Sequence, residues 1–438
     1  MVALFTGGTT VPGSALSETT SSQPASISDY IITEHPVRDG SPVAGGAGAT
    51  TGWAWGEDSP KSIRVIVSRA SGEQLGTALV TPAEESTLLR RTRLSPQTFD
   101  RCVVVSDVSI VPSAPSDTLA SLLYFCGRRG RLWGRAMVVA ALAKDVATQA
   151  GAVIALEPLS KLKSFDAGGQ TWVMHAQRLD VAIHHAWGAS SSAMQASLRE
   201  HFVPEAVEML ETWIPTLFSN PWFRAVQDGT LTKEQYIYTL GNLHQFVRWT
   251  TRLIGRAVSH STDRRLRNKW VEHLRGEVDH ELIIERDLAA LGADVEYVVS
   301  SMVPSVETQQ FMVSQESMIG FHADPVRFEA PPFVAEGYAA HLDQKFIDAL
   351  RSTARGWGIE NPKQVTAFYA SHIDFDGGYD GHWELGRNML KEHLKTDGDL
   401  VRFLNVARLC MDSVNRSYTA YVDDLRIYSA TSPGDAPR

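Results

Sequence analysis

The chain has 438 residues, of which 43% are hydrophobic and 21% are charged, and its formal net charge is −9. This length predicts two domains, and the ordinary apolar fraction excludes a chain that is disordered throughout. A mildly acidic chain lacks the basic stripe typical of nucleic-acid binders, and no apolar run approaches the roughly 20 residues that span a bilayer. Since the N-terminus also has no secretory-signal pattern, we expect a cytoplasmic protein without nucleic-acid or membrane partners.

The first half of the sequence predicts a flexible tail followed by a small α/β domain. Residues 1–51 are rich in Ser, Thr, Gly and Pro and show no apolar period, which is typical of a disordered segment. Residues 52–188 contain short β-branched runs bounded by turn residues and one longer run at helical spacing. We therefore expect strands at 64–68, 77–81, 102–111 and 152–156 and a helix at 132–150.

The second half predicts an all-α domain over residues 199–430, after a small-residue linker at 189–198 and before a disordered tail at 431–438. Apolar residues recur at helical spacing, and Asn-Pro and Gly signals separate the segments. The expected helices are 202–218, 232–259, 263–291, 305–320, 332–356, 361–376, 383–396 and 398–426.

Two pairs of polar residues in the helical half have the spacing of metal ligands. Glu277 and His280 stand at i, i+3, and His372 and Asp376 at i, i+4, so each pair projects from one face of a helix. Helical bundles hold iron or manganese with carboxylate and imidazole ligands from facing helices. A single Glu-x-x-His also occurs by chance on many surface helices, so the hypothesis rests on both pairs together.

The motifs in this half resemble the heme-oxygenase-like helical fold, and within it the diiron oxidases and N-oxygenases. The resemblance covers about residues 200–428 and rests on Asn220-Pro221-Trp222, Glu277-x-x-His280 and Phe368-x-x-x-His372-x-x-x-Asp376. It implies two Fe(II) ions, O2 as co-substrate and an external electron donor such as a reductase. It also implies N-oxygenation of a small-molecule amine in secondary metabolism, with C–C cleavage as the other chemistry of such enzymes.

The resemblance assigns ligands residue by residue. Glu277, His280, His372 and Asp376 match it directly. A further carboxylate is expected near 335, where Glu336 is preferred to His341. The first core helix has no carboxylate, so His244 is the expected ligand there. The family usually has a histidine three residues after the aspartate; position 379 is Tyr here, so the nearby His382 is expected to take that role. We interpret the remaining histidines as structural or solvated: His260, His273, His322 and His393.

The substrate pocket is suggested only in outline. Arg248 and Arg252 lie near His244, and Phe311, Met312 and Phe321 could line the bundle. An amino-azole, or an amino acid held by an arginine through its carboxylate, would suit such a pocket.

The small domain resembles the acyl-CoA N-acyltransferase (GNAT-like) fold through Arg131-x-x-Gly134-x-Ala136, expected to open the helix at 132–150. In that family this segment holds the CoA pyrophosphate at a helix N-terminus. An arginine-rich surface turn, or a surface that forms a homodimer, are the alternatives.

Two rival functions remain open. One is a metal-free heme-oxygenase-like enzyme of the pyrroloquinoline-quinone-synthase or thiaminase type, the latter requiring a nucleophilic cysteine, for which Cys410 is the candidate. The other is a CoA-dependent acyltransferase with a helical accessory domain. The three cysteines are odd in number and lack CxxC spacing, so we expect buried free thiols.

Overall fold

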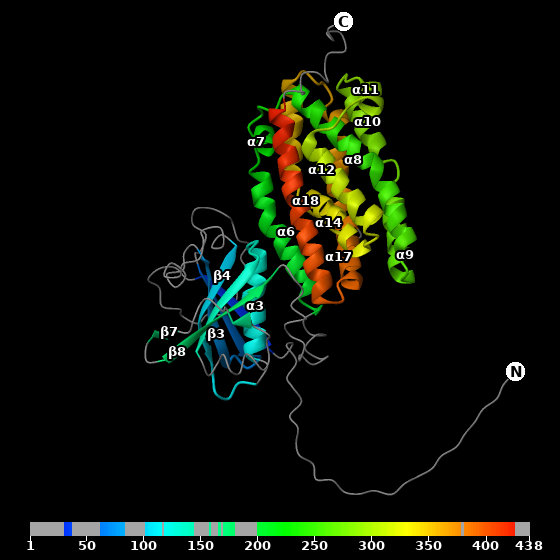
Figure 1. Cartoon of the computed structure of the whole chain (residues 1–438). Helices are drawn as coiled ribbons and strands as arrows, with labels where there is room; N and C mark the ends of the chain where they lie inside the picture. Colours follow the sequence, from blue (N-terminus) through cyan, green and yellow to red (C-terminus); the bar gives the residue numbers. More distant parts are fainter. Residues whose placement is uncertain are drawn as a thin grey trace, which may run out of the picture.

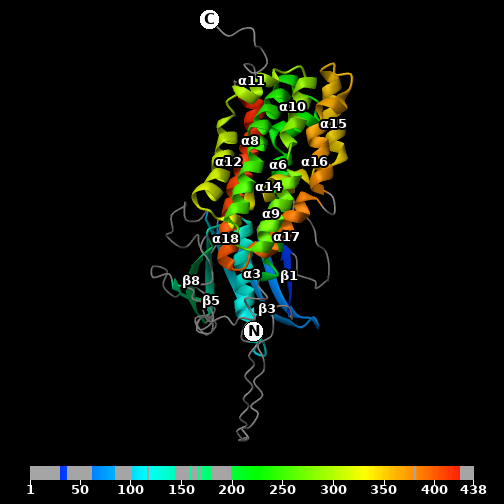
Figure 2. The same cartoon turned by 90° about the vertical axis from the view of Figure 1, so that its right-hand side faces the viewer.

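The computed structural model describes residues 30–36, 62–83, 101–115, 118–143, 157–158, 165–167, 170–179, 199–377 and 381–424. Within them, a mixed β-sheet with helix α3 packed on it precedes a bundle of helices, as Figures 1 and 2 show. The predicted order, a small α/β domain followed by an all-α domain, is confirmed. The expected linker at 189–198 and tail at 431–438 lie outside the described residues.

The sheet has the strand order β1-β2-β3-β4-β5-β8-β6, with β7 paired to β8. Strands β4 and β5 are parallel and α3 (Thr118–Leu132) connects them, while the other described pairs are antiparallel. Buried residues alternate along β2, because α3 covers one face of the sheet. The strands are β1 (Tyr30–Pro36), β2 (Ile63–Arg69), β3 (Gln74–Pro82), β4 (Cys102–Ile110), β5 (Met137–Ala143), β6 (Glu157–Pro158), β7 (Phe165–Ala167) and β8 (Gln170–Arg178).

Strand β1 corrects the expectation for the N-terminal tail. Residues 30–36 were expected to be disordered, but they pair with β2 along their whole length, from Tyr30 opposite Arg69 to Pro36 opposite Ile63. Ile31, Ile32 and Thr33 are β-branched and favour a strand. The remaining parts of the expected tail lie outside the described residues.

The helix and the strand that follow β4 both lie earlier in the chain than expected. The helix expected at 132–150 is wrong for residues 137–143, which form β5, and the helix lies earlier, as α3. Gly127 and Gly130 weaken the helical signal of α3, yet they are needed for close packing. A Cβ at Gly130 would approach Leu179 to 2.8 Å and Val103 to 2.9 Å. The segments 144–150 and 152–156 lie outside the described residues.

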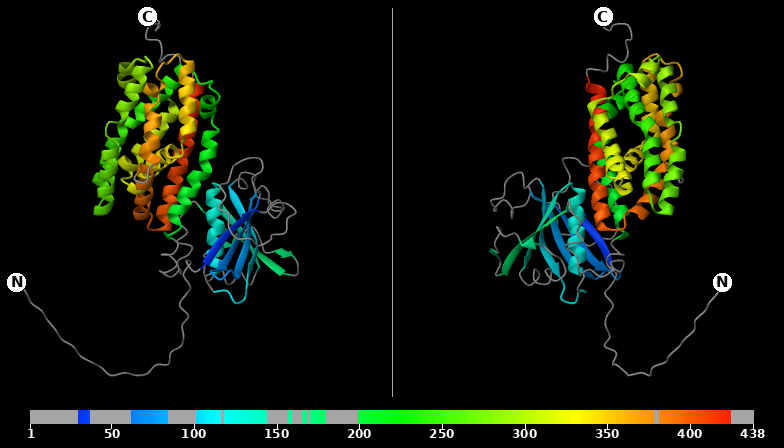
Figure 3. Two further views of the ribbon diagram at one scale, coloured as in Figure 1. Left: turned by 180° about the vertical axis from the view of Figure 1, so that it is seen from behind. Right: turned by 45° about the vertical axis from the view of Figure 1, so that its right-hand side comes forward.

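Most of the long helices of the second half lie side by side with their axes roughly aligned and form the bundle seen in Figure 3. They are α6 (Phe202–Phe218), α8 (Lys233–His260), α9 (Arg264–Gly276), α10 (His280–Ala290), α12 (Val306–Glu316), α14 (Ala330–Ala339), α15 (Gln344–Gly356), α16 (Ala367–Gly377), α17 (His382–His393) and α18 (Asp397–Asp423). Shorter segments complete it: α7 (Pro221–Gln227), α11 (Val295–Ser300), the π-helical η4 (Ser317–Phe321), α13 (Pro325–Phe328) and the 3-10 helix η5 (Pro362–Val365).

Several predicted helix ends are confirmed by their caps. Asn220 accepts a hydrogen bond from the backbone N–H of Trp222 at the start of α7. Gly292 and Gly358, with φ of +75° and +80°, follow α10 and α15. Glycine adopts this left-handed conformation at no steric cost, so it ends a helix readily.

Two expected helices are interrupted, and the first interruption shapes the site described below. The segment 263–291 forms two helices, because the chain turns at residues 277–279 with Asp279 in the left-handed conformation (φ 69°). The segment 332–356 likewise divides into α14 and α15. At 305–320 the α-helix ends at Glu316 and continues as η4.

Buried apolar side chains run from the sheet through α3 and α6 into the bundle. This continuity follows from the contact of α3 with α6, where Phe125 meets the ring of His201. The three cysteines are buried free thiols, as predicted. Among the described residues, no helix has both the length and the apolarity needed to cross a bilayer.

Candidate metal centre

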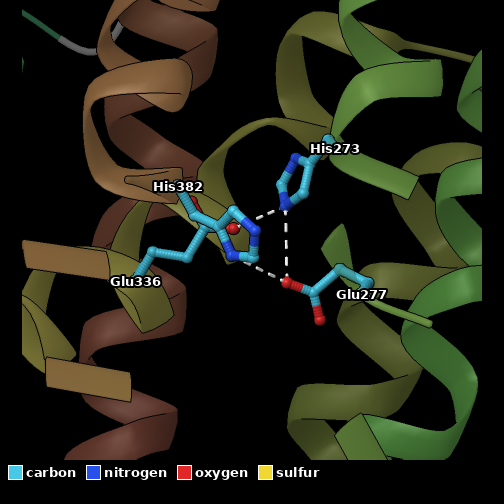
Figure 4. A group of neighbouring side chains, drawn as sticks. All are labelled: His273, Glu277, Glu336 and His382. Atoms are coloured by element: carbon cyan, nitrogen blue, oxygen red, sulfur yellow. Dashed lines mark ion pairs between the residues drawn. The ribbon is translucent and has the colours of Figure 1, made fainter. Parts of the chain in front are cut away.

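Five helices and the turn between α9 and α10 bring carboxylates and imidazoles together inside the bundle. Glu277 lies in the turn, directly after α9, and His280 is the first residue of α10. These side chains, four of which Figure 4 shows, are His273, Glu277, His280, Glu336, His372, Asp376 and His382, called here the carboxylate–histidine cluster.

Glu277 lies at the centre of the cluster and uses its two oxygens in different directions. Its Oε1 is 3.2 Å from Nδ1 of His382 and 3.8 Å from Nε2 of His273, while its Oε2 is 3.2 Å from Nδ1 of His280. Burial would raise the pKa of Glu277, but hydrogen bonds from His280 and His382 hold it well below its usual range. Glu277 therefore links two groups of histidines.

The first group contains His273, Glu336 and His382. Nε2 of His273 lies 2.6 Å from Oε1 of Glu336. With Glu277, these residues offer one ligand atom each, all within 4.8 Å of one another. Burial lowers the pKa of His273, but the Glu336 carboxylate beside it outweighs burial, so the pKa is raised.

The second group contains His280, His372 and Asp376. The ring centroids of His280 and His372 are 5.3 Å apart. Nδ1 of His372 donates to the carbonyl oxygen of Phe368 at 2.7 Å, which fixes the ring and leaves Nε2 as its acceptor, as is common for metal-binding histidines. Oδ1 of Asp376 is 3.4 Å from Nδ1 of His382, so the two groups meet there as well.

Several acceptor atoms in the cluster have no hydrogen-bond donor. Both carboxylate oxygens of Asp376 and Oε2 of Glu336 are buried and accept no hydrogen bond. Buried polar groups are normally satisfied, and a buried carboxylate without a donor is costly. A cation coordinated by these lone pairs would remove that cost, so the residues present fit a metal. Three carboxylates and four imidazoles form a donor set suited to iron or manganese.

Gly276, the last residue of α9, makes room for the histidine from α17. A Cβ at Gly276 would lie 2.2 Å from Nε2 of His382, so only glycine there permits this approach. On the other side, α16 ends at Gly377 and α17 starts at His382. The chain is therefore interrupted between these two helices, so that His382 reaches the cluster from α17, and Tyr379 lies outside the described residues.

Most of the predicted ligands meet in the cluster, with one exception and one omission. His244 does not join it, because its Nε2 pairs with Oε1 of Glu285 at 3.0 Å on the facing helix α10. His341, the alternative to Glu336, donates to the carbonyl oxygen of Gly337 and stays outside. His273 was interpreted as structural, but it lies in the cluster; its spacing of i, i+4 to Glu277 was a visible signal.

A cavity opens beside the cluster. Glu277, His280, Glu336, His372 and Asp376 line it together with apolar residues from α8, α12, α14 and α16. Of the predicted lining residues, Phe311 faces the cavity, whereas Phe321 is 82% exposed on η4. The cluster is thus accessible to a small molecule that enters the bundle.

The predicted CoA-binding segment has a different role in this structure. Gly134 and Ala136 lie between the C-terminal end of α3 and the start of β5, so the expected helix N-terminus is absent there. Arg131 is 1% exposed and pairs with Glu205 of α6 through Nε (2.7 Å) and Nη2 (3.0 Å). The guanidinium thus joins the two domains and is unavailable for a pyrophosphate.

Two neighbouring arginines extend this contact. Arg128 and Arg129 both pair with Glu208 of α6 and with Glu34 of β1. We call these three arginines and three glutamates the interdomain ion cluster. It buries α3 against the bundle and defines how the sheet meets the helices.

No protein-family model matches the chain, and no curated protein matches it. Among solved structures, it is similar to a domain of unknown function with a heme oxygenase-like fold from Shewanella denitrificans OS217, with 20% identity over 54% of this chain and 98% of that chain and a TM-score of 0.46. A TenA homologue from Pseudomonas syringae pv. tomato DC3000 aligns with 11% identity over 52% and 93% of the two chains, TM-score 0.41. The AHL synthase LasI aligns with 14% identity over 30% and 70%, TM-score 0.24. At these identities and TM-scores, the alignments say nothing of what this chain binds or catalyses.

Proposed function

We propose that the helical domain is a non-heme diiron oxygenase that uses O2 to oxidise the amine nitrogen of a small metabolite. The observation that carries the proposal is the position of Glu277. Its two carboxylate oxygens face two separate groups of histidines, which is the arrangement expected of a carboxylate shared by two metal ions.

The chain's own residues divide between two metal positions. His273, Glu336 and His382 would hold one ion with Oε1 of Glu277, and His280, His372 and Asp376 would hold the other with Oε2. Two Fe(II) ions bound there would supply electrons for the reduction of O2 and open positions for it. Phe368 holds His372 in its ring orientation through its carbonyl oxygen, which keeps one nitrogen of that imidazole available.

The proposed reaction balances with an external donor. One oxygen atom of O2 is inserted into an N–H bond and gives a hydroxylamine, and the other leaves as water with two protons and two electrons from a reductant. A separate reductase is the expected source of those electrons. The cavity's apolar wall would keep bulk water away from the cluster, which protects an oxidising site from side reactions.

Anaerobic titration with Fe(II) tests the metal centre. We expect two irons per chain by metal analysis and a dinuclear signature by Mössbauer spectroscopy. The variant Glu277→Gln should take up at most one iron, because the shared carboxylate is lost. Glu285→Gln is a matched control, since Glu285 lies on α10 and pairs with His244 outside the cluster.

If Glu277→Gln still binds two irons, Glu277 is not a ligand of the centre. If the wild-type chain binds no iron, the proposal is wrong. A chain that binds iron is then mixed with O2 and candidate amines in the presence of a chemical reductant. Hydroxylamine formation that requires iron supports the N-oxygenase, whereas release of carbon fragments would indicate C–C cleavage.

A further inference from the structure

The cavity beside the cluster has an almost entirely apolar wall apart from the cluster residues themselves. Leu243 and Phe246 of α8 and Phe311 of α12 face it, as do Phe328, Leu342 and Phe368. Side chains of this kind favour an apolar ligand, because they offer dispersion contacts and no hydrogen bonds.

No lysine or arginine is among the described residues that line the cavity. The two arginines expected to anchor a substrate are used elsewhere: Nη1 of Arg248 donates to the carbonyl oxygen of Val299 at 2.7 Å, and Arg252 lies over the Trp249 ring at 4.4 Å. In the metal-free chain, a substrate carboxylate in this cavity would therefore be buried beside Glu277, Glu336 and Asp376 with no arginine or lysine to pair with, which is costly.

Among the neutral polar side chains of the wall, the hydroxyls of Tyr338 and Tyr369 bond to Tyr418, which leaves Gln315 and Thr250 for recognition. Gln315, near the end of α12, is 6% exposed, lines the cavity and makes no hydrogen bond within the described part of the chain. Its amide can donate and accept at once. Thr250 of α8 also lines the cavity but is less buried. A buried, unpartnered amide facing a cavity gains a hydrogen bond when a ligand brings one.

We infer that the cavity takes an amine with an uncharged, largely apolar body and that Gln315 provides the hydrogen bond to a neutral polar group on that body. The inference rests on the proposed function, because it assigns the substrate of the same site. It excludes the amino acids that the arginine-anchored hypothesis favoured. The neutral form of the amine carries the lone pair that oxidation requires.

A matched pair of ligands tests the charge preference without turnover. Binding of 4-propylaniline and of 3-(4-aminophenyl)propanoate is measured anaerobically by calorimetry, on the full chain with and without Fe(II). We expect the neutral aniline to bind at least tenfold more tightly to the metal-free chain, in which no arginine, lysine or metal ion faces the carboxylate. Equal or tighter binding of the carboxylate to that form would overturn the inference. Failure to take up iron would defeat the proposed function while the comparison on the metal-free chain still stands.

Substitutions on α12 place the ligand in this cavity. Phe311→Arg should abolish binding of 4-propylaniline, whereas Val313→Arg, which adds the same charge at a position 65% exposed on that helix, should not. Unchanged binding in Phe311→Arg would overturn the placement. If Phe311→Arg does not fold, the matched ligands on the wild-type chain still decide the charge preference.

A separate binding measurement tests the role of Gln315. In the variant Gln315→Leu, binding of 4-(3-hydroxypropyl)aniline should weaken by about five- to tenfold, the contribution of one neutral hydrogen bond. Binding of 4-propylaniline, which lacks the hydroxyl, should not weaken. Equal weakening of both ligands would show that Gln315 only fills space and would overturn its assignment as a specificity residue.

Discussion

The interdomain ion cluster and the carboxylate–histidine cluster each bring three carboxylates together, but the groups that face those carboxylates differ. At the domain contact, Glu205 receives two hydrogen bonds from Arg131, whose charge is permanent. In the bundle, the carboxylates of Glu336 and Asp376 keep oxygens that accept no hydrogen bond, and their neighbours are imidazoles. At the domain contact each carboxylate faces an arginine, whereas in the bundle the carboxylates face histidines, and three of their oxygens accept no hydrogen bond.

This difference separates a structural ion pair from a binding site. Arginine supplies a fixed fork of donors that fills carboxylate lone pairs, and nothing further can bind there. Histidine can be neutral and can offer a lone pair of its own, so a group of carboxylates and histidines is able to bind a cation. Buried carboxylates alone therefore do not indicate a metal centre. Whether they can bind a metal depends on whether arginine or histidine lies beside them.

A substitution that breaks the interdomain ion cluster should have the largest effect on stability. Arg131→Met would remove both hydrogen bonds to the buried Glu205 carboxylate and leave it with Arg128 at 3.9 Å, and we expect a loss of about 3 kcal/mol in the free energy of unfolding. Chemical denaturation measures this. The control is Arg69→Met, because Arg69 and Glu73 form an exposed pair at 2.9 Å that should contribute less than about 1 kcal/mol.

The double variant Arg131→Met/Glu205→Met sharpens the same point. Replacing both charges with apolar side chains should recover much of the lost stability, since a buried ion pair gains little over good apolar packing. A loss of less than about 1 kcal/mol in Arg131→Met alone would show that Glu205 finds another cation and would contradict the description of this contact.

In the carboxylate–histidine cluster, removal of a charge should have the opposite effect on the stability of the metal-free chain. Removing charge with Asp376→Asn should leave the metal-free chain as stable as the wild type or more stable, because burial disfavours the Asp376 carboxylate and its oxygens accept no hydrogen bond, although His382 lies 3.4 Å away. Fe(II) or Mn(II) at 100 times its dissociation constant should stabilise the wild type by about 2.7 kcal/mol and the variant much less. Thermal unfolding with and without metal measures both. Marked destabilisation of metal-free Asp376→Asn would indicate a purely structural role.

The sequence predicted the general plan well because its signals are local. Asn220-Pro221, Gly292 and Gly358 mark helix ends through caps and φ angles, which neighbouring residues determine. The order of domains followed from the change in apolar period. Six of the seven residues in the carboxylate–histidine cluster could be named beforehand from spacing and resemblance.

The remaining features depend on packing that no local pattern reveals. The turn at residues 277–279 contains neither glycine nor proline, so 263–291 resembled one helix. Helix α3 was missed because its glycines fit against Leu179 and Val103, residues distant in sequence. Likewise, the pairing of His244 with Glu285 is a contact between two helices, which spacing within one helix cannot predict.

A third kind of buried carboxylate should make stability depend on pH. Asp287 accepts hydrogen bonds only from the backbone N–H groups of Phe368 and Ala367, and burial outweighs them and raises its pKa to about 7. Between about pH 4 and pH 7 the folded chain holds a proton that the unfolded chain has released. The free energy of unfolding should therefore fall with rising pH, by at most about 1.4 kcal/mol per pH unit, and level off above pH 7.

Asp287→Asn isolates this contribution, because asparagine keeps an acceptor and does not titrate. The stability of the variant relative to the wild type should rise between pH 4 and pH 7 and stay constant above. A difference that does not change with pH would show that Asp287 is ionised throughout and that its backbone hydrogen bonds outweigh burial.

The smallest expected change concerns two glycines in the bundle. Gly255, on α8, has no atom within 4 Å of a Cβ built there, so Gly255→Ala should stabilise the chain by about 0.5–1 kcal/mol. Gly276→Ala should forfeit that gain, because its methyl group would meet the ring of His382. It should also weaken metal binding by about tenfold, since a displaced histidine no longer orients toward the cluster. If Gly276→Ala binds metal as tightly as Gly255→Ala, His382 is not a ligand, and the first metal position would depend on His273, Glu277 and Glu336 alone.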